Sequence, residues 1–159
     1  MAGQGIVLAQ EAHIVNILPP IDANGSARNS DVFSMRHYGH ATIIVQVGVS
    51  AGAVSTVTVE ECDDFVPSTA TAIAFSVYKE ETAAGDTLGS KVAATTSGFA
   101  MSTNNNIFYV IEVDARQLSD GYDNLRISLT DPTASMIVSA VAILTGARFA
   151  NDQNQTEIA

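Results

Sequence analysis

The densest group of potentially reactive side chains is the segment 36–40, with the sequence Arg-His-Tyr-Gly-His. Imidazole nitrogens are common zinc ligands, so two histidines in one segment could contribute to a metal site. His37 and His40 fall on opposite faces of an unbroken strand, and a bulge at Gly39 would be needed to bring them together. His13 or the acidic run 60–64 could supply further ligands, but no spacing selects them. We therefore expect no metal and no cofactor, and place these side chains in solvent or at an interface.

The second candidate is that acidic run, Glu-Glu-Cys-Asp-Asp at residues 60–64. Calcium takes several oxygen ligands, but the Asp-x-Asp-x-Asp-Gly pattern is missing, so a solvated strand end is the favoured interpretation. The acidic neighbours of Cys62 disfavour its thiolate and make it a poor nucleophile. The sequence also has no Gly-x-Ser-x-Gly elbow, phosphate-binding glycine loop or His-Glu-x-x-His helix, and we expect that the protein is not an enzyme.

The elements that must position these residues are β-strands, because apolar and polar side chains alternate with a period of two. Between Ala41 and Val49 every odd position is apolar. A turn at 50–53 is expected to join this strand to the next one as a hairpin. Predicted strands cover residues 32–38, 40–49, 54–62, 72–79, 107–114, 124–130 and 136–144, with weaker ones at 88–95 and 98–101.

These strands predict an all-β protein, an antiparallel β-sandwich of jelly-roll type. An immunoglobulin-like sandwich is the alternative, because Leu118–Tyr122 is similar to the tyrosine corner of that fold. The strand 136–144 is apolar on both faces, which indicates a position in mid-sheet under cover or in a subunit interface.

The chain divides into three parts. Residues 1–31 are predicted to be an N-terminal arm or edge strand with a loop, because Pro19 and Pro20 cannot donate ladder hydrogen bonds. Residues 32–148 form the β-sandwich domain, and residues 149–159 form a polar C-terminal tail. The predicted contacts with a partner or with other copies are Ile6, Val7, Leu8, Ile14, Val15, Ile17, Arg148 and Phe149.

Composition limits the possible partners. Seventeen acidic and seven basic residues give a formal charge of −10, which disfavours nucleic acid and acidic membrane surfaces. Aromatic residues are only 6% and Trp is absent, so the core is thin and further burial between subunits is expected. The chain has a single cysteine, no basic start and no apolar run of about 20 residues, which predicts synthesis in a reducing cytoplasm.

Four segments together resemble head decoration (cement) proteins of tailed bacteriophages. These segments are residues 36–49, 72–79, 122–130 and 137–144. The similarity is one of residue pattern and strand order, and it spans about residues 33 to 148. The resemblance implies a jelly-roll homotrimer, made in the host cytoplasm, that binds major capsid protein subunits on the capsid exterior. The rival interpretations are a phage tail or receptor-binding β-module and, third, a jelly-roll enzyme or metal-binding protein.

Overall fold

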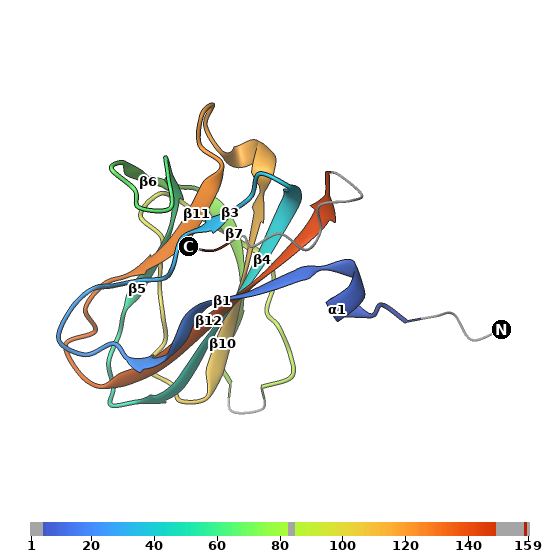
Figure 1. The fold of residues 1–159 in the computed structure, drawn as a ribbon. Coiled ribbons are helices and arrows are strands. Elements are labelled where there is room, and N and C mark those ends of the chain that lie inside the picture. Colours follow the sequence, from blue (N-terminus) through green and yellow to red (C-terminus); the bar gives the residue numbers. More distant parts are fainter. Residues whose placement is uncertain (1–4, 83–84, 149–157, 159) are drawn as a thin grey trace.

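The computed structural model describes residues 5–82, 85–148 and 158, which form two β-sheets packed face to face (Figure 1). The elements in chain order are α1 (Leu8–Glu11), β1 (His13–Asp22), β2 (Arg28–Asn29), β3 (Phe33–Ser34), β4 (Tyr38–Ser50), β5 (Thr56–Cys62), β6 (Ala70–Ile73), β7 (Phe75–Glu80), β8 (Val92–Ala94), β9 (Phe99–Ala100), β10 (Ile107–Asp114), the 3-10 helix η1 (Ala115–Gln117), β11 (Asn124–Leu129) and β12 (Met136–Ala147).

The two sheets have the connections of a jelly roll. Sheet A has the strand order β1-β12-β4-β10-β7-β8, and sheet B has the order β2-β11-β5-β6, with β3 beside β11 and β9 beside β5. The chain crosses between the sheets from β1 to β2, from β3 to β4, from β4 to β5, from β6 to β7, from β8 to β9, from β9 to β10, from β10 to β11 and from β11 to β12. The two antiparallel sheets confirm the predicted sandwich, and the strand orders β1-β12-β4-β10 and β2-β11-β5-β6, with the first strand beside the last, are those of a jelly roll.

Alternation along the long strands builds the core. On β4 the side chains of Ile43, Val45 and Val47 are buried, and on β10 those of Ile111 and Val113 are buried, while the residues between them are partly or fully exposed. Successive side chains of a strand point to opposite faces, so each strand of sheet A has one face toward sheet B and one face outward. The predicted period of two is therefore confirmed for both strands.

The predicted hairpin at 50–53 is wrong. The segment is a turn, in which the N–H of Ala53 donates to Ser50 Oγ at 3.1 Å. However, β4 belongs to sheet A, and β5 pairs with β11 and β6 in sheet B. The error has a simple origin: a local turn does not determine the partner of the next strand, and Val57 and Val59 of β5 are buried by crossing to the second sheet.

Other predicted strand boundaries also differ; for example, of the weaker strands at 88–95 and 98–101, only Val92–Ala94 and Phe99–Ala100 are strands. The strand expected at 72–79 is divided at Ala74, where the chain passes from β6 in sheet B to β7 in sheet A. Its predicted inward residues Ile73, Phe75 and Val77 are all buried, because both pieces face the same core. In the segment predicted as a strand at 32–38, only Phe33–Ser34 is a separate strand.

The bulge at Gly39 that would be needed to bring His37 and His40 together is absent. His40 pairs with Thr145 and Tyr38 with Ala147, without a register shift between them. A Cβ at Gly39 would lie 3.3 Å from the carbonyl oxygen of Gly146, which is tighter than most Cβ contacts. Gly39 therefore permits close approach of β4 and β12.

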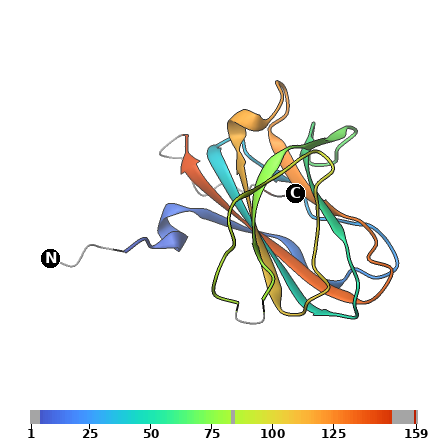
Figure 2. The same cartoon turned by 180° about the vertical axis from the view of Figure 1, so that it is seen from behind.

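The N-terminal segment 13–22 is the edge strand β1 of sheet A, paired with β12. Register shifts flank Leu18, and the exposed Pro19 and Pro20 lie within the second irregular stretch. Figures 1 and 2 show α1 standing beyond the sheets on the side of the N-terminus. None of the described helices is long and apolar enough to cross a membrane.

Candidate interaction surfaces

Side chains of the segment 36–40 pack in the core or contact other side chains of the same chain. Tyr38 points into the core and is 2% exposed, whereas His40 lies on the outer face of sheet A. His40 Nε2 lies 2.7 Å from Glu112 Oε2, and the hydroxyl of Thr42 donates to the same oxygen at 2.7 Å. Within residues 5–82, 85–148 and 158, no group of three or more His, Cys, Asp or Glu side chains is arranged to hold a metal ion.

The carboxylates of the acidic run point to different partners. Glu60 accepts from Arg126 Nε at 2.7 Å, and both side chains are 19% exposed. Glu61 is buried and accepts from the N–H of Ser119 at 2.7 Å. Asp63 accepts from the Ser68 hydroxyl and the Thr69 N–H, which hold the pKa of its carboxyl below the usual value. The run therefore ties β5 to its neighbouring strand and loops.

The thiol of Cys62 is buried, and we expect it to react slowly. Its side chain is 0% exposed, and burial raises the pKa of its thiol to about 11. Since the thiolate is the reactive species, we expect alkylation of Cys62 by iodoacetamide at pH 8 to be at least about 100-fold slower in the folded protein than after unfolding. Mass spectrometry of timed reactions with and without guanidinium chloride measures the ratio; rapid alkylation without denaturant would show that the thiol is accessible.

The residues predicted as partner contacts divide into three groups. Ile6, Val7 and Leu8 are exposed at 79%, 47% and 42%, and Ile14 is exposed at 49%. The other two aliphatic candidates, Val15 and Ile17, are 5% and 0% exposed; they belong to the core of their own sandwich, which accounts for their apolar character without a partner.

The remaining two predicted contacts are Arg148 and Phe149. Arg148 is exposed just after β12, and its N–H donates to the carbonyl of His37 at 2.8 Å. Phe149 lies outside the described residues.

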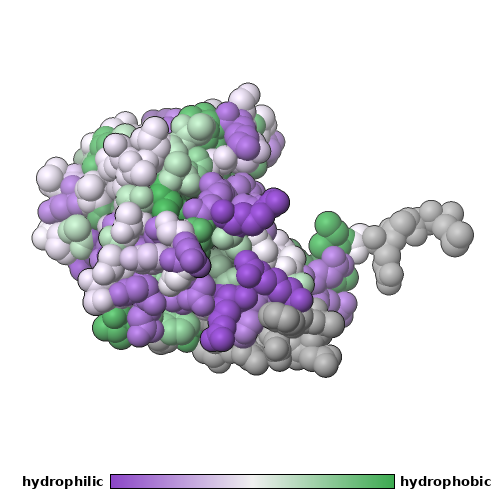
Figure 3. All heavy atoms as spheres, turned by 90° about the horizontal axis from the view of Figure 1, so that it is seen from above, coloured by the Kyte–Doolittle hydropathy of each residue, from purple (hydrophilic) through white to green (hydrophobic). Residues whose placement is uncertain are grey.

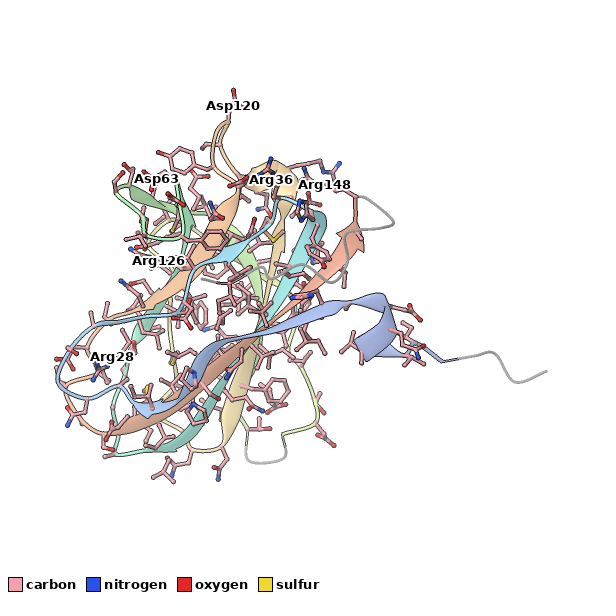
Figure 4. The ribbon with its side chains drawn as sticks, in the orientation of Figure 1. Arg28, Arg36, Asp63, Asp120, Arg126 and Arg148 are labelled. Carbon is pink, nitrogen blue, oxygen red and sulfur yellow. The ribbon has the colours of Figure 1, made fainter. Side chains whose placement is uncertain are left out.

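Arg148 shares a surface hollow with Arg36. The loop after η1, which contains Asp120, Tyr122 and Asp123, forms the other side of this hollow. Figure 4 shows both arginines at the end of the molecule where Asp120 projects, and Figure 3 shows that end with hydrophilic side chains between small apolar areas. The arginines bring positive charge to this hollow, where Asp120 and Asp123 also lie.

The outer face of sheet A includes the strand predicted to be apolar on both faces, 136–144, and the predicted contact Ile14, but it extends over three further strands. Val141, Ile44, Val110 and Tyr78 are direct cross-strand neighbours on β12, β4, β10 and β7. These side chains are partly exposed, although the opposite face of each strand already supplies the core. We call the following set the outer apolar face: Ile14, Ile44, Tyr78, Phe108, Val110, Ile137, Val141 and Ile143.

The rest of this face is mostly uncharged. Ile14 is paired with Ile143, and the next positions along that row are Thr42 and Glu112. A shallow hollow lies at the other end, where Gly48 has no side chain and Phe108 and Ile137 line the two sides. One signal in the sequence could have revealed this face: neighbouring apolar residues such as Ile43-Ile44 and Val110-Ile111 break the alternation.

Comparisons with known proteins give weak similarities. No protein-family model and no curated protein matches the sequence. Among solved structures, the chain is similar to "SPBc2 prophage-derived protein YomS", with 14% identity, a TM-score of 0.43, and coverage of 84% of this chain and 93% of that one. It is also similar to a structure of infectious bursal disease virus Gt strain, with 12% identity, a TM-score of 0.22, and coverage of 86% of this chain and 37% of that one. With TM-scores below 0.5, neither similarity indicates a function.

Proposed function

We propose that this protein is a structural component of a bacteriophage virion. It binds the outer surface of the capsid as a homotrimer and stabilises it by bridging major capsid protein subunits. The observation that supports an assembling, structural role is the outer apolar face, where four uncharged side chains are direct neighbours across four strands. Monomeric proteins rarely leave contiguous apolar patches of several hundred Å² in water, so such a face marks an interaction site.

The polar groups of the molecule favour the same role. The His40–Glu112 pair, the Glu60–Arg126 pair and the carboxylate of Glu61 are all held by partners within the chain. A protein of this kind acts by contact, and no bond has to be made or broken. Because a ligand that binds only the assembled shell shifts the equilibrium toward assembly, attachment at 100 times its dissociation constant stabilises the shell by about 2.7 kcal/mol per site.

The test is binding to capsids of the encoding phage from which accessory proteins have been removed. We expect co-sedimentation that saturates at a fixed ratio to the major capsid protein, together with a higher melting temperature of the capsid. Absence of binding, or binding to host cells without binding to capsids, would contradict the proposal; the second result would favour a receptor-binding module.

Arg148 offers a matched pair of variants for that experiment. Arg148→Glu reverses the charge of a predicted contact beside Arg36, and we expect it to lower capsid affinity about tenfold, which corresponds to about 1.4 kcal/mol. Lys91→Glu changes the net charge equally at an exposed position before β8, and we expect little effect. Equal losses in both variants would mean that net charge, and not the position of Arg148, determines attachment.

A further inference from the structure

We infer that the outer apolar face of sheet A is the surface through which copies of this chain associate with one another. Only the biological role of the oligomer rests on the proposed function, because copies can associate through this face without a capsid. Its occupant is a second copy of the same chain.

The geometry of the face suits contact with another flat apolar surface. Its centre is the row Val141–Ile44–Val110–Tyr78, in which each residue is paired directly with the next. Direct cross-strand neighbours have Cβ atoms roughly 5 Å apart, so these four side chains form a continuous ridge across the sheet. Ile14 and Ile143, themselves a pair, extend the apolar surface to the edge strand β1.

Charge favours a second copy as the occupant. The chain has a formal charge of −10, so most approaches of two copies bring like charges together. The central row has no ionisable side chain except the phenol of Tyr78. The carboxylates of Glu112 and Glu80, each two residues from this row on its own strand, accept hydrogen bonds from His40 and Thr42 and from Thr82 and Thr87. Two copies can therefore meet here with little repulsion and without burying an unpaired carboxylate.

The size of the face is also suitable. Five strands about 4.8 Å apart and four outward rows about 6.8 Å apart give a footprint of roughly 400 Å² for each copy. Two such footprints amount to roughly 800 Å², in which the polar positions Asn16, Gln46 and Ser139 are already counted, and this is the size of a small, reversible interface.

Contact between copies also explains why β12 is apolar on its outward face as well as on its inward face. β12 lies between β1 and β4, and its inward residues Val138, Ala140 and Leu144 already supply the core. Ile137, Val141 and Ile143 contribute little to the fold of a single copy, because their outward side chains remain partly exposed. Contact between copies gives these three residues a role.

The test is the molar mass of the purified full chain between 1 and 100 μM, by light scattering and sedimentation equilibrium. We expect an oligomer for the unchanged protein. Val110→Lys and Ile44→Lys place a charge in the central row and should weaken association at least about 100-fold. Ser128→Lys adds the same charge at a partly exposed position on sheet B and should leave the mass unchanged.

Three results would overturn the inference: a monomer at 100 μM, an unchanged oligomer in both lysine variants of sheet A, or equal dissociation by Ser128→Lys. If a lysine variant loses the β-sheet signal in circular dichroism, Val110→Thr keeps the side-chain shape and should still weaken association about tenfold. An intact oligomer that fails to bind capsids would contradict the proposed function and leave this inference supported.

Discussion

Gly98→Ala is expected to lower the free energy of unfolding by more than about 3 kcal/mol, since it combines a backbone penalty with a steric clash. Gly98 has a φ of +71°, a region that alanine adopts at a cost. A Cβ at this position would lie 2.0 Å from the carbonyl oxygen of Val57 and 2.8 Å from Thr58 Cγ2. Backbone atoms cannot move away without disturbing the pairing of β9 with β5, in which Phe99 lies opposite Val57.

Gly121→Ala is the matched control for this prediction. Gly121 has a φ of +86°, but no heavy atom lies within 4 Å of the position that its Cβ would take. We expect it to lose only the backbone contribution, about 1 kcal/mol. Guanidinium chloride unfolding of both variants measures the difference, and equal losses would show that β9 does not approach β5 as closely as described.

The strands could be predicted from the sequence because their alternation is a local property. β4, β10 and β11 lie within one or two residues of their predicted ranges. Their partners could not be predicted in the same way. The turn after Ser50 suits a hairpin as well as a crossing, and the break at Ala74 has no proline or glycine to mark it.

The candidate surface was only partly predictable for a related reason. Ile14 was selected because it lies in an apolar run near the N-terminus, and it does lie on the outer apolar face. Ile44, Val110 and Tyr78 come from three separate strands, and only the register of sheet A makes them neighbours. A surface built across strands depends on long-range pairing, which the pattern of a single strand does not contain.

The second large effect is expected at two successive residues of β10, Ile111 and Val110. Ile111 is 0% exposed and packs between the sheets, so Ile111→Ala should lower the free energy of unfolding by about 2–5 kcal/mol through lost burial and the cavity that remains. Val110→Ala removes less volume from a partly exposed position on the outer face and should cost less than about 1 kcal/mol within a single copy.

Comparison of Ile111→Ala with Val110→Ala distinguishes an effect on folding from an effect on association. Because association adds stability that depends on protein concentration, both variants should be unfolded by urea at several concentrations. Ile111→Ala should lose stability at every concentration, whereas Val110→Ala should mainly lose the dependence on concentration. If Val110→Ala is as destabilising as Ile111→Ala in dilute solution, Val110 faces the core, and the outward face of sheet A is not available to a second copy.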